Sequence, residues 1–129
     1  MNWKSIKDIY LKVLCDNNKI KYLGENKYLL INKNGDKHWY LNGKLHREGG
    51  PAVEYIDGTK CWYLNGKLHR EDGPAIEYAN GGEEWYIHGF RHRENGPAFI
   101  GADGFEQWYN NGEYVEEPKE SHDWEKEGF

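Results

Sequence analysis

A repeat of 23 residues is the feature that most limits what this chain of 129 residues can fold into. Tryptophan recurs with this period and is followed by tyrosine each time, at Trp39-Tyr40, Trp62-Tyr63, Trp85-Tyr86 and Trp108-Tyr109. The segment H-R-E-x-G-P-A has the same period and begins at His46, His69 and His92. Such a period is typical of proteins in which each repeat buries its apolar surface against its neighbours. We therefore expect a single domain over residues 1–129.

Turn dipeptides divide each period into strands. They alternate 8 and 15 residues apart, at Asn34-Gly35, Asn42-Gly43, Asp57-Gly58, Asn65-Gly66, Asn80-Gly81, His88-Gly89, Asp103-Gly104 and Asn111-Gly112. Such pairs favour type I′ hairpin turns, whose two central residues both need a positive φ. The short spacing leaves one strand, as at residues 59–64, and the long spacing leaves two, as at 67–70 and 75–79, separated by an E-x-G-P corner. The pattern predicts a mainly β fold: an antiparallel meander of about a dozen short strands in a single sheet that is twisted or curled.

The two ends depart from the repeat. Residues 1–27 are expected to form a capping α-helix and an irregular first strand, because apolar residues between Trp3 and Leu14 follow helical spacing. A helix of this kind would cover the open end of the repeat array. Residues 28–115 are assigned to the array, although residues 28–32 fit the period poorly. Residues 116–129 are expected to form an acidic tail.

The stretch W-Y-L-N-G-K-L-H-R-E-D-G-P-A at residues 62–75 resembles MORN-type repeats, which are 23-residue β-hairpin repeats rich in glycine and aromatic residues. The resemblance spans about residues 28–114. It is greatest to a variant with H-R-x-D-G-P-A cores in bacteriophage, giant-virus and mobile-element proteins, and a related variant occurs in antitoxins. The resemblance implies an elongated β scaffold that binds proteins and brings no catalytic residues.

Composition limits the classes of function. The chain is polar, with a mean hydropathy of -1.04, yet 16% of its residues are aromatic. A disordered chain of this polarity is typically poor in aromatic residues, so we expect this chain to fold. Residues 1–47 hold 10 Lys and Arg against 4 Asp and Glu, whereas residues 48–129 hold 7 against 18. The acidic part argues against direct nucleic-acid binding and favours a basic partner. The chain has neither a secretion signal nor an apolar run that could span a membrane, and its two cysteines form no C-x-x-C pair, so we expect a reducing, cytosolic setting. The resemblance to phage and mobile-element proteins implies that this is the cytoplasm of a bacterial host.

The aromatic residues form two ladders on opposite faces of the expected sheet, since neighbours in a strand point to opposite sides. One alternative is that the curled sheet buries the tryptophans and the tyrosines pack on the helix, on their strand neighbours or on one another. The other is that Tyr40, Tyr63, Tyr86 and Tyr109 form an exposed surface that binds a partner. Phe90 and Arg91 are added to this partner-binding set, because they replace the Lys-Leu of the other repeats.

The recurring His-Arg-Glu triplets are interpreted as structural. An active site needs one asymmetric constellation, whereas these triplets occur three times, at His46-Arg47, His69-Arg70 and His92-Arg93, each followed by Glu. Together with Trp39, Trp62, Trp85 and Trp108, these residues are expected to hold the repeats together through hydrogen bonds and ion pairs. His-x-Glu alone supplies too few ligands for a closed metal site. No catalytic residue, metal or cofactor is expected.

These observations predict a non-enzymatic repeat scaffold that binds another protein. The expected setting is a phage or mobile element, where the chain would inhibit a host protein, for example one of antiviral defence. One alternative is an antitoxin or immunity protein that neutralises a co-encoded toxin. Another is an acidic mimic of nucleic acid that blocks a nucleic-acid-binding enzyme. A homodimer formed through the sheet edges is left open.

Overall fold

A computed structural model describes residues 18–118, and every regular element in this range is a β-strand. The long strands at the two ends of the array are β1 (Lys19–Gly24), β2 (Lys27–Ile31), β3 (Lys37–Leu41), β14 (Glu106–Asn110) and β15 (Glu113–Val115). The short strands between them are β4 (Lys44–Leu45), β5 (Val53–Glu54), β6 (Lys60–Cys61), β7 (Tyr63–Leu64), β8 (Lys67–Leu68), β9 (Ile76–Glu77), β10 (Glu83–Glu84), β11 (Tyr86–Ile87), β12 (Phe90–Arg91) and β13 (Phe99–Ile100). The expected capping helix and most of the expected acidic tail lie outside the described residues.

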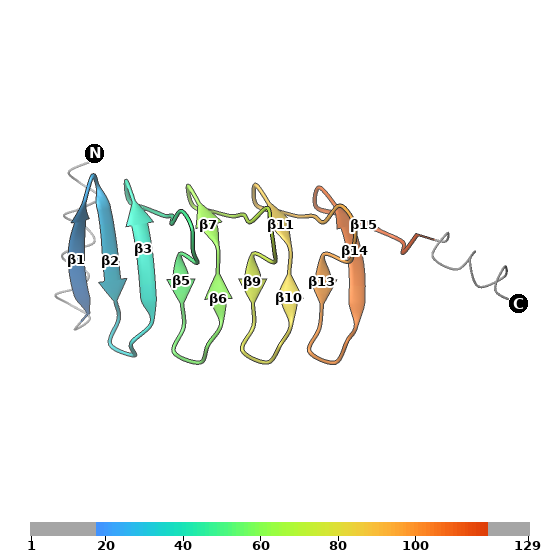
Figure 1. Cartoon of the computed structure of the whole chain (residues 1–129), viewed down its shortest axis with the longest axis horizontal. Helices are drawn as coiled ribbons and strands as arrows, with labels where there is room; N and C mark the ends of the chain where they lie inside the picture. Colours follow the sequence, from blue (N-terminus) through green and yellow to red (C-terminus); the bar gives the residue numbers. More distant parts are fainter. Residues whose placement is uncertain (1–17, 119–129) are drawn as a thin grey trace, which may run out of the picture.

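Most of the strands form one long, open antiparallel sheet with the order β1-β2-β3-β5-β6-β9-β10-β13-β14-β15, in which β4 also pairs with β3. The hairpins β7-β8 and β11-β12 each form a separate two-stranded sheet. In Figure 1 the strands of the long sheet lie side by side in a single row, and β1 and β15 are at its two ends. The expected meander of many short strands is thereby confirmed. The first strands are more regular than expected, because β1 and β2 pair over their length with a single shift of register between Tyr22 and Gly24.

Each long strand of the repeat changes its pairing partner at the tryptophan. Cys61 in β6 pairs with Ile76 in β9, whereas Tyr63 in β7 pairs with Leu68 in the hairpin strand β8. Trp62 lies between them: its amide donates to Ala75 O at 2.7 Å, and its carbonyl accepts from the amide of His69 at 3.0 Å. The single strand expected at 59–64 is therefore divided into β6 and β7.

The E-x-G-P corner carries the chain from the hairpin strand back into the sheet. The alanine that ends each corner is fully buried, at Ala52, Ala75 and Ala98. Neighbouring hairpins are joined by backbone hydrogen bonds. Those between the β7-β8 hairpin and the β11-β12 hairpin run from Arg70 N to Tyr86 O at 3.1 Å and from Gly89 N to Leu68 O at 2.8 Å. The hairpins thus line up beside one another along one edge of the array, as Figure 1 shows.

The eight turn dipeptides make two kinds of turn rather than one. The first residue has a positive φ at Asn42, Asn65, His88 and Asn111, as a type I′ turn requires. At the other four dipeptides only the glycine has a positive φ. There the loop is one residue longer: Gly58 N bonds to Tyr55 O, and Tyr55 N bonds to Thr59 O. This is a type I turn followed by a left-handed glycine, so the type I′ prediction is wrong at these four turns.

The register gives the sheet two faces. The arginine face carries the tryptophans, the corner arginines and a row of charged residues, namely Lys37, Glu54, Lys60, Glu77, Glu83 and Glu106. The tyrosine face carries the tyrosine ladder and the row His38, Val53, Cys61, Ile76, Glu84, Phe99 and Gln107. The buried side chains belong largely to the tyrosine face and include Tyr28, Leu30, Val53 and Cys61. All four ladder tryptophans are half-buried.

Candidate functional site: the two faces of the sheet

On the arginine face, each corner arginine stacks on the tryptophan of its own repeat. The guanidinium carbon lies 3.8 Å from the ring centroid in all three repeats, for Arg47 on Trp39, Arg70 on Trp62 and Arg93 on Trp85. Each arginine also donates through Nη1 to the carbonyl of the corner proline at 3.1 Å. A guanidinium held in this way is fixed in place, because cation–π stacking and a backbone hydrogen bond both constrain it.

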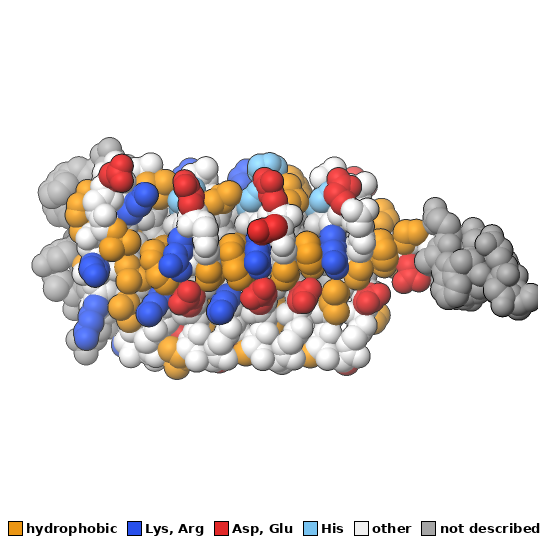
Figure 2. Space-filling model, in the orientation of Figure 1, with side chains coloured by type: hydrophobic (Ala, Val, Ile, Leu, Met, Phe, Trp, Pro, Cys, Tyr) orange, Lys and Arg blue, Asp and Glu red, His pale blue; other side chains and the backbone are white. Residues whose placement is uncertain are grey.

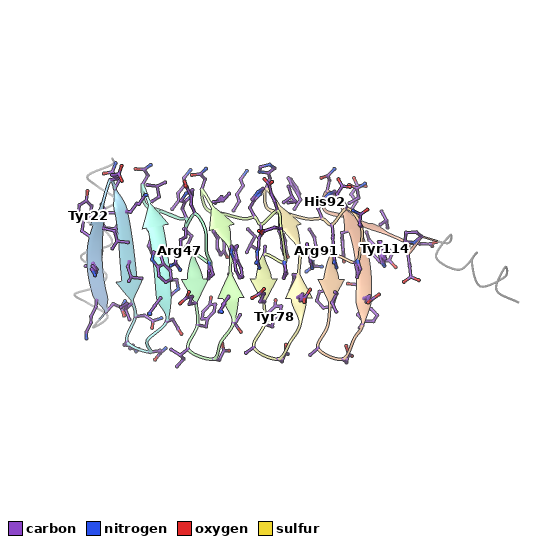
Figure 3. All side chains as sticks on the ribbon, in the orientation of Figure 1. Tyr22, Arg47, Tyr78, Arg91, His92 and Tyr114 are labelled. Atoms are coloured by element: carbon purple, nitrogen blue, oxygen red, sulfur yellow. The ribbon has the colours of Figure 1, made fainter. Side chains whose placement is uncertain are left out.

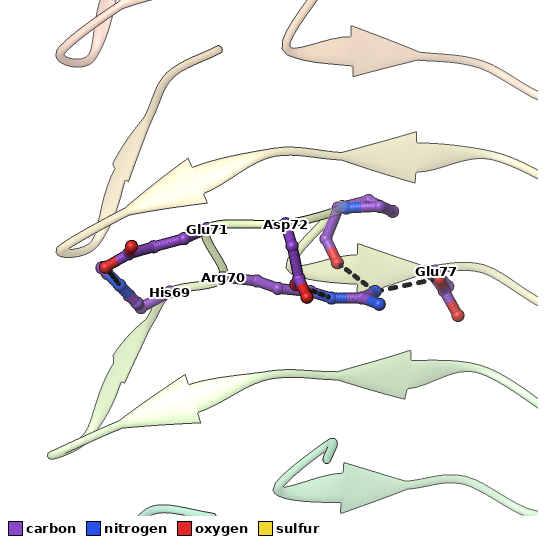
Figure 4. Close-up of polar contacts among 6 residues, drawn as sticks. His69, Arg70, Glu71, Asp72 and Glu77 are labelled. Atoms are coloured by element: carbon purple, nitrogen blue, oxygen red, sulfur yellow. Dashed lines mark hydrogen bonds and ion pairs between the residues drawn. The ribbon is translucent and has the colours of Figure 1, made fainter. Parts of the chain in front are cut away.

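The arginines differ in their carboxylate partners. Arg47 pairs with Glu54 at 3.3 Å, and Arg70 pairs with Glu77 at 3.0 Å. Arg70 has a second partner in Asp72, at 3.3 Å from its Nε, and Figure 4 shows its guanidinium between these two carboxylates and the proline carbonyl. In the described chain, Arg93 has no carboxylate within ion-pair distance.

The corner histidines join each repeat to the next. Their Nδ1 atoms accept a hydrogen bond from the amide of a turn residue 19 positions later, at 2.9 Å for His46 and His69 and at 3.0 Å for His92. An accepting Nδ1 carries no proton, so the neutral ring is protonated at Nε2. In each repeat Nε2 faces the glutamate two residues on, at 3.5, 3.2 and 3.6 Å. Within residues 18–118, no three His, Cys, Asp or Glu side chains are grouped as a metal site would require.

The tyrosine ladder is half-buried rather than exposed. Each of its four members is partly accessible to solvent, namely Tyr40, Tyr63, Tyr86 and Tyr109. Burial raises the pKa of the first three phenols above the ordinary value. The structure places these four tyrosines on one face as half-buried side chains, and Tyr109 packs edge-on against Tyr114 with ring centroids 5.8 Å apart.

Five other aromatic residues on the tyrosine face are exposed, and none of them was predicted as a binding residue. The exposed fractions are 59% for Tyr22, 41% for Tyr55, 38% for Tyr78, 56% for Phe105 and 61% for Tyr114. Figure 3 places Tyr22 at the β1 end and Tyr114 at the β15 end, so this set spans the sheet. The sequence did contain a signal, because Tyr55 and Tyr78 are also 23 residues apart.

A buried carboxylate at Glu84 organises the third repeat on the tyrosine face. Its side chain accepts hydrogen bonds from Tyr78 Oη at 2.5 Å, from Tyr86 Oη at 2.9 Å and from Arg91 Nη2 at 2.7 Å. Burial alone would raise the pKa of Glu84, but these hydrogen bonds and the charge of Arg91 outweigh burial and hold it below the ordinary value. The nearby thiol of Cys61 has its pKa raised to about 11, chiefly by burial, so it is not an activated nucleophile.

The two residues singled out from the third hairpin therefore differ in environment. Arg91 is held by Glu84, and its guanidinium lies 4.9 Å from the ring centroid of Tyr109. Phe90 is 57% exposed and pairs with Ile87, which places it on the opposite side from Arg91. Phe90 is thus free to contact a partner at the hairpin edge, whereas Arg91 is occupied by contacts within the sheet.

Two grooves on the arginine face lie between successive corners. The groove between the first and second corners has a volume of about 460 Å³, and that between the second and third has a volume of about 510 Å³. Trp62 and Leu64 contribute to the first, and Trp85 and Ile87 contribute to the second. Figure 2 shows separate blue patches of Lys or Arg side chains above a row of red and blue charged side chains.

Comparisons with known proteins find no matching family model, no similar curated protein and no similar solved structure. In residues 18–118 the structure contains no helix with the length and apolar character needed to cross a membrane.

Proposed function

We propose that this chain is a non-enzymatic repeat scaffold that binds another protein through the tyrosine face. The observation that carries this proposal is the set of five exposed aromatic residues on that face: Tyr22, Tyr55, Tyr78, Phe105 and Tyr114. Exposed aromatic side chains supply most of the binding energy at protein interfaces, because they bury a large area at a low cost in side-chain entropy.

Two of these exposed residues pack against other tyrosines of the same face. Tyr109 packs edge-on against Tyr114, with ring centroids 5.8 Å apart, and Tyr22 lies 5.4 Å from Tyr28. An anchor that is already packed against a fixed neighbour loses less freedom when it binds. In the free protein these aromatic side chains would therefore already have nearly the conformation that they adopt when a partner is bound.

The resemblance to phage and mobile-element repeat proteins supports a biological role as an inhibitor of a host protein, for example one of antiviral defence. An antitoxin would use the same face, and only the gene beside this one distinguishes the two roles. The nucleic-acid mimic has less support. Of the carboxylates on the arginine face, Glu77 is paired with Arg70, and Glu83 accepts a hydrogen bond from Trp85 Nε1 at 3.2 Å.

The test is affinity capture from host lysate, identification of the captured protein, and calorimetry with the purified partner. We expect Tyr55→Ala and Phe105→Ala each to weaken binding by about tenfold or more, as the loss of an aromatic anchor does. Ile56→Ala is the matched control, because Ile56 is 70% exposed but lies in a turn. Equal affinities for the wild type and both aromatic variants would contradict the proposal.

A further inference from the structure

We propose that Arg93, on the arginine face, binds the carboxylate of an acidic side chain that a partner protein inserts into the groove between the second and third corners. The site is separate from the tyrosine face and does not depend on the function proposed for that face. The inference comes from a comparison of the three corners. In the first two a carboxylate of the chain itself contacts the corner arginine, and in the third none from the described residues does.

The second corner shows the occupied form of the site. There the guanidinium of Arg70 is stacked on Trp62, is bonded to the proline carbonyl, and contacts Asp72 and Glu77. Figure 4 shows the contacts of Arg70 with the proline carbonyl, Asp72 and Glu77. The positions equivalent to the two acids in the third corner are Asn95 and Ile100, so both carboxylates have been replaced by uncharged residues.

The third corner keeps the other two contacts of its arginine, the stack on tryptophan and the hydrogen bond to the proline carbonyl. Arg93 has the same 3.8 Å stack on Trp85 and the same 3.1 Å hydrogen bond to Pro97 O as its counterparts. Its guanidinium is thus held in the same orientation but has no acidic partner among the described residues. No nitrogen of Arg93 is both buried and without a hydrogen-bond partner, so the donors that it does not use remain accessible. A fixed guanidinium that retains unused donors matches the geometry of a carboxylate.

The groove around Arg93 has room for the side chain of a partner. Its volume is about 510 Å³, and Trp85 and Ile87 give it an apolar part. Two acidic residues, Glu71 and Glu94, also line it, but their carboxylates are directed to His69 at 3.2 Å and to His92 at 3.6 Å. Both are 81% exposed, so solvent screens their repulsion of an incoming acid. The favoured ligand is therefore glutamate or aspartate beside an apolar residue.

The test is a titration of the full-length, ¹⁵N-labelled protein with the blocked tripeptide acetyl-Leu-Glu-Leu-amide, followed through the Nε–Hε signals of the arginines. We expect a saturable shift of the Arg93 signal, about tenfold weaker binding of the peptide with Gln in place of Glu, and no comparable shift of Arg47 or Arg70. Arg93→Lys assigns the signal. Ile100→Glu restores the internal carboxylate and is expected to abolish the shift.

The proposal is overturned if the Arg93 signal does not move, if the Glu and Gln peptides act equally, or if Arg70 responds as strongly as Arg93. A response to inorganic phosphate without one to the Glu peptide would also overturn it. Should Ile100→Glu fail to fold, the comparison of the two peptides on the wild-type chain still decides the matter. Tyr55→Ala is expected to leave the shift unchanged, which separates this site from the tyrosine face.

Discussion

At the scale of single residues, the carboxylate of Glu84 gives the clearest prediction, because three donors depend on it. Replacing Glu84 with Ala would leave the hydroxyls of Tyr78 and Tyr86 and the charge of Arg91 without their acceptor. We expect the free energy of unfolding to fall by about 3 kcal/mol, as when one partner of a buried ion pair is removed. Urea denaturation followed by tryptophan fluorescence measures this change.

The neighbouring repeat supplies the matched control for this prediction. The positions of Glu84 and Arg91 are occupied there by Cys61 and Leu68. The double variant Glu84→Cys/Arg91→Leu copies that apolar arrangement, so we expect it to recover most of the stability lost in Glu84→Ala. A double variant less stable than the single one would show that Glu84 and Arg91 do not form the coupled pair described above.

At the scale of elements, the third hairpin turn contains a residue poorly suited to its conformation. His88 has a φ of 51°, where the other repeats have Asn, which adopts the left-handed region more readily. We expect His88→Asn to raise the unfolding free energy by about 0.5 kcal/mol, measured by thermal denaturation. Gly89→Ala, at a φ of 86°, should lower it instead. If the two changes shift stability in the same direction, backbone conformation does not control this turn.

The sequence predicts the antiparallel meander of many short strands, because the tryptophan period and the turn dipeptides recur along the array. It fails where one local pattern serves two conformations. Asp57-Gly58 and Asn65-Gly66 look alike, yet the first pair closes a longer loop whose geometry depends on the bond between Gly58 N and Tyr55 O. Similarly, the strand breaks at Trp62 because the corner rejoins the sheet beside it, at Ala75. The turn dipeptides do not predict this position.

The candidate site was predicted less completely than the fold. The tyrosine ladder was placed on one face, but its half-burial depends on packing between strands that the period does not describe. The Glu84–Arg91 pair had only half a signal in the sequence: Arg91 replaces the leucine of the two preceding repeats, whereas the position of Glu84 differs in every repeat. Arg91 was assigned to a partner because such a departure can serve a contact inside the sheet or one outside it. The register that pairs Tyr86 with Arg91 places the guanidinium beside Glu84 instead.

At the scale of the whole molecule, each repeat contacts mainly the repeats beside it, so stability should grow with the number of repeats. We predict that a second copy of residues 59–81, inserted after Gly81, extends the sheet and raises the urea midpoint of unfolding. The insertion keeps every contact between neighbouring repeats, including that of Tyr78 with Glu84, because the copy ends with the same residues. Far-ultraviolet circular dichroism during urea denaturation measures the midpoint and the width of the transition.

The matched control is an insertion of residues 60–81, which is one residue shorter. Removing one residue moves the following strand out of register and turns its side chains to the opposite face. This control should therefore lower the midpoint or divide unfolding into two transitions, whereas the full copy should keep one. If both insertions behave alike, the 23-residue period does not set the register between repeats, and the array is held together by contacts within each hairpin instead.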